Sequence, residues 1–78
     1  MTLNELKKIF PTASLETWHQ HSNGGGWVEN TAHVDATAYV GPKAQVFGQA
    51  RVSGHALVLG QAQVYGQAWV YGKARVYG

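Results

Sequence analysis

The sequence predicts an all-β solenoid, in which short strands wind into a coil and stack on one another. Three observations predict it. All nine valines of the chain are spaced six residues apart, from Val28 to Val76. An alanine follows four residues after each valine except the last, and from Val46 onward a glycine follows two residues after each valine. A fixed short period of this kind is typical of repeat proteins, in which each unit contacts only its neighbours.

Each repeat unit combines a short strand with a turn. The pattern Ala-x-Val-x alternates between two faces, as a β-strand does, and places alanine and valine on the same face. The glycine and the polar residue after it interrupt the strand and turn the chain. Each strand is then expected to pair with the one below it at a spacing of about 4.8 Å. Because only valine and alanine occupy the inward positions, we expect a narrow interior without water.

The clearest repeats, Val-Tyr-Gly-Gln-Ala-Trp and Val-Tyr-Gly-Lys-Ala-Arg, resemble those of hexapeptide-repeat proteins, and the resemblance covers residues 28–78. The chain is especially similar to phage- and prophage-encoded members with tandem Tyr-Gly-x-Ala-Arg-Val, some of which have a Gly-Gly-Trp-Val-Glu segment like residues 25–29. The resemblance implies a left-handed parallel β-helix with three repeats in each turn, and therefore about three coils. Most units depart from the commoner enzyme pattern, because glycine follows the valine by two residues; only Val40-Gly41 keeps that pattern.

If three repeats make one turn, residues eighteen positions apart stack on one another. Three inward valine ladders follow: Val28/Val46/Val64, Val34/Val52/Val70 and Val40/Val58/Val76. The outward residues sort onto three faces, of which the third is predicted to be the most apolar. The large side chains of this third face are Tyr39, Leu57, Leu59, Arg75 and Tyr77.

Residues 1–26 are predicted to form a helical N-terminal cap ending in a glycine-rich turn, and residues 27–78 the repeat domain. Thr2 and Glu5 have the spacing of a capping box, which predicts a helix over residues 1–10 that ends before Pro11. A second short helix is predicted over residues 12–19. We expect this segment to cover the first coil, whose backbone and apolar interior are otherwise exposed.

Composition excludes several classes of protein. The length allows one domain, and the absence of cysteine fits a reducing compartment. No signal peptide and no long apolar run is present, so we expect a cytoplasmic protein without membrane contact. The net charge is only +2, and the basic residues of the repeat are spread over different faces, which argues against nucleic acid as a partner.

Histidines are the candidates for catalysis, because the best-known enzymes of the resembling family are acyltransferases that use a histidine base at a subunit interface. His33 and His55 are the only histidines inside the repeat, and they occupy different positions of the unit. Asp35 lies two residues from His33 and is not expected to orient it. The chain also lacks the long loop and extra coils that form an acyl-donor cleft. We therefore predict no catalytic residue and no cofactor.

A zinc site is the other chemical alternative, since γ-class carbonic anhydrases share the implied fold and bind zinc through three histidines across an interface. His33 and His55 do not stack, and the repeat has no third histidine. His19 and His21 form a His-x-His pair, whose rings would converge only on an extended backbone. We predict no metal site.

Outward aromatic and aliphatic residues favour protein contacts instead. The repeat stops at Gly78 in mid-pattern. Either the sequence is truncated there or another molecule covers that end, and we expect the second. The predicted interface comprises Tyr39, Leu57, Leu59, Tyr65, Trp69, Tyr71, Arg75 and Tyr77. The expected partners are a second copy of the chain, with a homodimer favoured over a trimer, and a further protein whose identity the sequence does not give.

The sequence therefore predicts a non-enzymatic protein-interaction module. The resemblance implies an origin in a phage or mobile element, and the module could inhibit a host defence complex in an anti-CRISPR-like manner. The alternatives are a minimal hexapeptide-repeat acyltransferase and a purely structural, self-assembling module.

Overall fold

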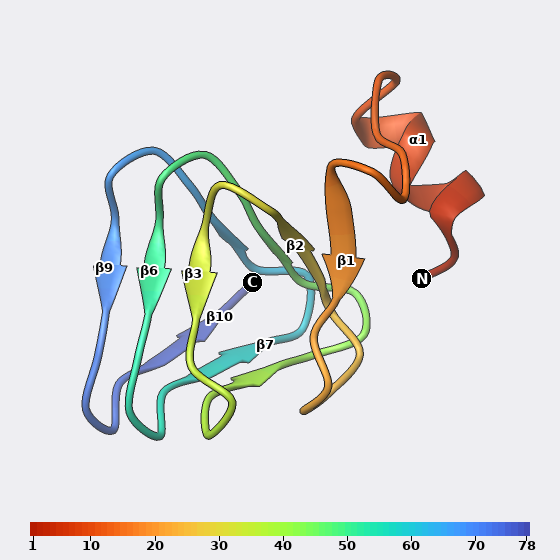
Figure 1. Cartoon of the computed structure of the whole chain (residues 1–78). Helices are drawn as coiled ribbons and strands as arrows, with labels where there is room; N and C mark the ends of the chain where they lie inside the picture. The colour runs from red at the N-terminus through yellow and green to blue at the C-terminus, as the bar shows by residue number, and fades with distance from the viewer.

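One helix and ten short strands make up the chain, and the computed structural model describes residues 1–78 (Figure 1). The elements are α1 (Leu3–Ile9), β1 (Trp18–Gln20), β2 (Trp27–Glu29), β3 (His33–Val34), β4 (Tyr39–Val40), β5 (Gln45–Val46), β6 (Arg51–Val52), β7 (Leu57–Leu59), β8 (Gln63–Val64), β9 (Trp69–Val70) and β10 (Arg75–Tyr77). The one helix, α1, has only seven residues and is too short to span a membrane.

The strands form three sheets with the orders β1-β2-β5-β8, β3-β6-β9 and β10-β7-β4. Figure 1 shows β3, β6 and β9 side by side, with α1 beyond β1. Every parallel pairing joins residues eighteen positions apart; Val52, for example, pairs with Val34 on one side and with Val70 on the other. The predicted stacking register is therefore confirmed.

The predicted fold class is wrong. We expected an all-β solenoid, a left-handed parallel β-helix of about three coils with a helical N-terminal cap. The structure has instead three separate short sheets, one mixed and two parallel, together with one short helix, and no sheet closes or continues around the molecule. The strands have only two or three residues. Left-handed glycines, such as Gly48 at φ 71° and Gly54 at φ 68°, turn the chain after the strands, so no strand is longer than three residues.

The main core lies between the three sheets and consists of valine and alanine alone, as the repeat predicts. Its buried members are Val28, Ala38, Val40, Ala44, Val46, Ala50, Val52, Ala56, Val58, Ala62 and Val64. Val34, Val70 and Val76 pack against this core but stay partly exposed. Burial of the valines is therefore complete in the middle of the stack and incomplete in β3, β9 and β10.

The N-terminal segment begins with the predicted helix. The Thr2 hydroxyl accepts the Glu5 N–H, and the Glu5 carboxylate accepts the Thr2 N–H, which completes the capping box at α1. A second small core joins this segment to the sheets: Leu6, Ala13, Trp18 and Trp27 are buried together. The indole N–H of Trp27 donates to the Met1 carbonyl at 2.9 Å, which holds the start of the chain against β2.

The second predicted helix, over residues 12–19, is wrong. Turns occupy this region, and Trp18 begins β1, which runs antiparallel to β2 with Trp18 opposite Glu29. The physical reason lies in the tertiary contacts of this segment. The strand form buries Trp18 in the small core and pairs its backbone with the free edge of β2, and this outweighs a weak local helix preference.

The glycine-rich turn after β1 covers the neighbouring strand β4. Gly26 N–H donates to the Val40 carbonyl at 2.9 Å, and Val40 N–H donates to the Asn23 carbonyl at 3.0 Å. A Cβ atom on Gly26 would lie 2.3 Å from a methyl carbon of Val40, so only glycine fits there. The N-terminal segment thus pairs with the outer strands β2 and β4 and leaves the opposite end of the stack uncovered.

Candidate interaction surface

Four large aromatic side chains lie exposed at the end of the stack remote from α1. Their exposed fractions are 58% for Tyr65, 64% for Trp69, 64% for Tyr71 and 69% for Tyr77. They lie in or directly after β8, β9 and β10, which are the outermost strands of the three sheets at that end. We call these four residues the aromatic rim.

The rim surrounds incompletely buried core positions. Ala68 and Ala74, which continue the inward alanine rows, are exposed, and Val70 and Val76 are only half-buried. Within residues 1–78, no strand pairs with the outer edges of β8, β9 and β10. Unpaired strand edges and uncovered apolar residues both favour association with another chain.

The rim residues differ in how firmly the chain holds them. The rings of Trp69 and Tyr71 contact each other, with centroids 5.5 Å apart. Tyr65 stacks on Phe47 at 5.2 Å with an angle of 11° between the ring planes, and Phe47 in turn contacts Phe10 at 4.8 Å. Tyr65 therefore packs partly against its own chain, whereas Tyr77 contacts no other aromatic ring.

The other predicted interface residues lie on the β10-β7-β4 sheet. Tyr39, Leu57 and Arg75 occupy one row across the three strands, and Leu59 pairs with Tyr77 in the next row. Tyr39, Leu57 and Leu59 are half-buried, whereas Arg75 is exposed. The apolar exposure expected of this third face is thus concentrated at Tyr77, and the rim forms the larger exposed aromatic surface.

The acidic and basic residues are distributed unevenly along the chain, although the net charge is only +2. All four acidic residues lie within residues 1–35, together with only two lysines. Residues 36–78 carry Lys43, Arg51, Lys73 and Arg75 and no acidic residue. The rim therefore belongs to the uniformly basic part of the chain. The basic character of residues 36–78 could have been recognised in the sequence from the positions of the acidic residues.

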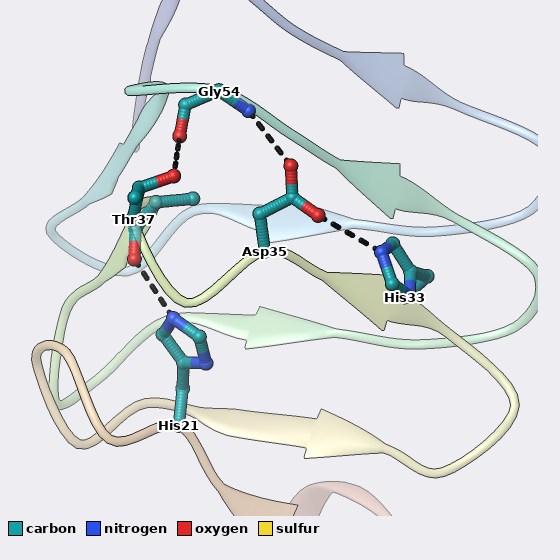
Figure 2. A network of polar contacts seen from close by, with 6 residues as sticks. His21, His33, Asp35, Thr37 and Gly54 are labelled. Carbon is teal, nitrogen blue, oxygen red and sulfur yellow. Dashed lines mark hydrogen bonds and ion pairs between the residues drawn. The ribbon is translucent and has the colours of Figure 1, made fainter.

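Two acidic residues fasten one turn of the chain to the next. Asp35 Oδ2 accepts the Gly54 N–H at 3.1 Å, and Thr37 Oγ1 donates to the Gly54 carbonyl at 2.6 Å (Figure 2). Glu29 and Thr31 contact the N–H and the carbonyl of Gly48 in the same way. We call each such set an acid–threonine clamp.

His33 lies beside one of these clamps. Its Nε2–H donates to Asp35 Oδ1 at 2.9 Å (Figure 2), so the expectation that no carboxylate orients His33 is wrong. Residues two apart on a strand share a face, and the outward face here brings the two side chains together. The Gly54 N–H, followed by His33, lowers the pKa of Asp35 below its ordinary value. The imidazole of His33 is 69% exposed.

The other histidines have separate surroundings. His19 Nδ1–H donates to Asn30 Oδ1 at 2.7 Å on the surface. His21 is buried, and its Nε2–H donates to the Ala38 carbonyl at 2.8 Å (Figure 2). The side chain of His55 is exposed. No group of three or more histidine, cysteine or acidic residues is placed to hold a metal ion.

No family model, curated protein or solved structure matches the chain. The resemblance to hexapeptide-repeat proteins therefore stays a prediction from the repeat itself. What the molecule does has to be argued from the aromatic rim, the strand edges around it and the charges near it.

Proposed function

We propose that the protein is a non-enzymatic interaction module that binds a protein partner through the aromatic rim. The observation that carries the proposal is the exposure of Tyr65, Trp69, Tyr71 and Tyr77 on the outermost strands of all three sheets. Aromatic side chains are enriched in the buried centres of interfaces, where they supply much contact area at a low cost in conformational entropy. The free edges of β8, β9 and β10 add backbone groups that a partner strand can pair with.

The partner is either a second copy of the chain or a different protein. In a homodimer, the form we favour, two rims meet end to end around a two-fold axis, so that each copy covers the strand edges of the other. A trimer formed side by side through the third face is the alternative. Because residues 36–78 carry only basic charges, an end-to-end homodimer brings like charges together, and screening by salt should strengthen it.

The biological setting rests on the resemblance of the repeat to phage-encoded proteins. On that basis the module acts in the cytoplasm, originates in a phage or mobile element, and inhibits a host defence complex by occupying its surface, in an anti-CRISPR-like manner. A purely structural, self-assembling role uses the same rim, and differs in requiring no partner other than the chain itself.

Paired rim and control variants test the proposal. Tyr71→Ala removes a rim ring directly after β9 and Tyr77→Ala removes one from β10, whereas Leu15→Ala removes a side chain that is 70% exposed on the N-terminal segment. Association is measured by sedimentation for the chain itself and by affinity capture from the native host for other proteins. Circular dichroism confirms folding. The proposal requires that both rim variants lose association while Leu15→Ala keeps it; equal effects of all three substitutions would contradict it.

A minimal acyltransferase is the second candidate, and one observation favours it: Asp35 orients the exposed imidazole of His33. An imidazole held by a carboxylate can serve as a general base towards a hydroxyl or amine. The test is consumption of an acyl-coenzyme A by the wild-type protein and by His33→Ala, with His55→Ala as the control. Activity lost only in His33→Ala would favour the enzyme.

A further inference from the structure

An open groove lies on the outer surface of the β3-β6-β9 sheet. It has a volume of about 670 Å³ and is lined by Thr31, His33, Gln49, Ala50 and Arg51. Beyond Arg51 it adjoins a hollow of about 280 Å³, which Gln49 and Arg51 share with Gln67, Ala68 and Trp69. We call the two together the arginine groove. We infer that the arginine groove binds an acidic side chain in a peptide segment of the protein partner, an inference that rests on the proposed function.

The strand register sets the order of residues along this groove. His33 pairs with Arg51, and Arg51 pairs with Trp69, on neighbouring parallel strands. The three residues therefore form one outward row, in which strands lie about 4.8 Å apart. Arg51 is placed between an imidazole and an indole. The contact of Trp69 with Tyr71 joins this row to the aromatic rim.

Arg51 has donors that nothing in the chain uses. No acidic side chain lies within salt-bridge distance of Arg51, since the one such contact in the structure joins His33 and Asp35, and no side-chain hydrogen bond involves Arg51. Asp35 is the acidic residue closest in sequence, but its two oxygens are engaged by His33 and Gly54, and it does not line the groove. A guanidinium presents a planar set of N–H donors that matches a carboxylate in a two-point contact.

The residues around Arg51 can bind the parts of a peptide that flank its acidic side chain. Gln49 and Gln67 line the groove, and their amide groups make no hydrogen bond within the chain, so they can bond to peptide backbone. Trp69 is 64% exposed and offers an apolar surface to the residue beside the acidic one. The groove therefore fits a short segment in which an acidic residue adjoins an apolar one.

A peptide suits the groove better than a nucleic acid does. Arg51 is the only lysine or arginine that lines it, since Lys43, Lys73 and Arg75 lie elsewhere. Nucleic-acid affinity comes mainly from several phosphates neutralised at once. A single guanidinium bordered by amides and an indole can satisfy one carboxylate, and it cannot follow a phosphate backbone.

A nuclear magnetic resonance titration tests the groove directly. The probe is the acetylated and amidated tetrapeptide Gly-Glu-Leu-Gly, and its control is the same peptide with Gln in place of Glu. We expect the glutamate peptide to shift the signals of His33, Arg51 and Trp69 and to bind about tenfold more tightly than the glutamine peptide. Arg51→Gln should remove this preference, whereas Arg75→Gln, at another exposed arginine outside the groove, should retain it.

Three results would overturn the inference: no shifts at millimolar glutamate peptide, equal binding of both peptides, or stronger shifts of the same signals by a thymidine oligonucleotide. The rim experiment separates this inference from the proposed function, because Tyr71 and Tyr77 do not line the groove. If the peptide fails while Tyr77→Ala still abolishes association, only the groove is refuted. If the peptide binds while association does not depend on the rim, the proposed function fails.

Discussion

Asp35 is joined to Gly54, nineteen residues further along the chain, by a hydrogen bond of 3.1 Å from the glycine N–H to the carboxylate. Thr37 donates to the carbonyl of the same glycine. Both backbone polar groups of Gly54 are therefore hydrogen-bonded to side chains of the preceding repeats. Glu29 and Thr31 repeat the arrangement at Gly48. These clamps fix the positions at which the chain turns between sheets, and the clamp at Gly54 makes stability depend on the ionised carboxylate of Asp35.

The first prediction is that stability falls in acid and that Asp35 contributes to the fall. Hydrogen bonding by Gly54, and then by His33, lowers the pKa of Asp35 in the folded state below its ordinary value of 3.8. Such a group stabilises the fold fully above the unfolded pKa and loses that contribution as the pH falls through the lower folded value. Thermal unfolding of Asp35→Asn should therefore depend less on pH below about pH 4 than that of the wild type.

Glu16→Gln is the control for this measurement, because the Glu16 carboxylate accepts no hydrogen bond and belongs to neither clamp. Some acid sensitivity should remain in Asp35→Asn, because the Thr2 N–H lowers the pKa of Glu5 in the same direction. Parallel melting curves for wild type and Asp35→Asn across this pH range would contradict the role given to the clamp.

The second prediction compares two valines of the same ladder. Val52 is fully buried between Val34 and Val70, whereas Val70 on the outer strand is half-buried. Val52→Ala should lower the free energy of unfolding by about 2 kcal/mol, because it leaves a cavity in the core. Val70→Ala should cost about 1 kcal/mol, since solvent already reaches the site. Chemical denaturation measures both, and equal losses would contradict the graded burial along the stack.

The third prediction compares two left-handed glycines. Gly54 at φ 68° and Gly72 at φ 66° both occupy a conformation that costs alanine about 1 kcal/mol. A Cβ on Gly54 would also lie 3.1 Å from the backbone of Gly72, whereas a Cβ on Gly72 meets nothing within 4 Å. Gly54→Ala should therefore be less stable than Gly72→Ala by about a further 1 kcal/mol. A larger loss in Gly72→Ala would show that the outer turn is itself packed against another molecule.

The repeat predicted much of the fold, because valines at a regular spacing determine both which side chains are buried and how neighbouring strands are aligned. Valines six residues apart predict inward positions that pair eighteen residues apart, and Val52 lies between Val34 and Val70 as expected. The continuity of the sheets could not be predicted in this way. It depends on how far each strand extends beyond its valine, and the repeat gives no measure of that length.

The N-terminal segment and the groove depend on contacts between distant residues. Trp18 has a helical neighbour pattern, but its burial with Trp27 favours a strand. The hydrogen bond of His33 with Asp35 depends on the outward direction of both side chains, the first on β3 and the second directly after it. Likewise, Arg51 is recognisable as unpaired only when no acidic residue is found beside it in space.

The last prediction uses salt to identify what covers the aromatic rim. If two copies meet end to end, Lys73 and Arg75 of each copy approach those of the other, because Lys73 lies in the turn after β9 and Arg75 in the outer strand β10. Raising sodium chloride from about 50 mM to about 500 mM should then strengthen self-association, since screening shortens the range of the repulsion. Lys73→Gln should reduce this salt effect.

Light scattering measures the mass, and a strictly monomeric mass at tens of micromolar protein (roughly the range in which weak dimers form) would refute the homodimer. A trimer broken by Leu59→Lys would move the interface to the third face. Association that weakens with salt would instead indicate contact between opposite charges, either the acidic N-terminal part of a second copy or an acidic partner protein at the rim.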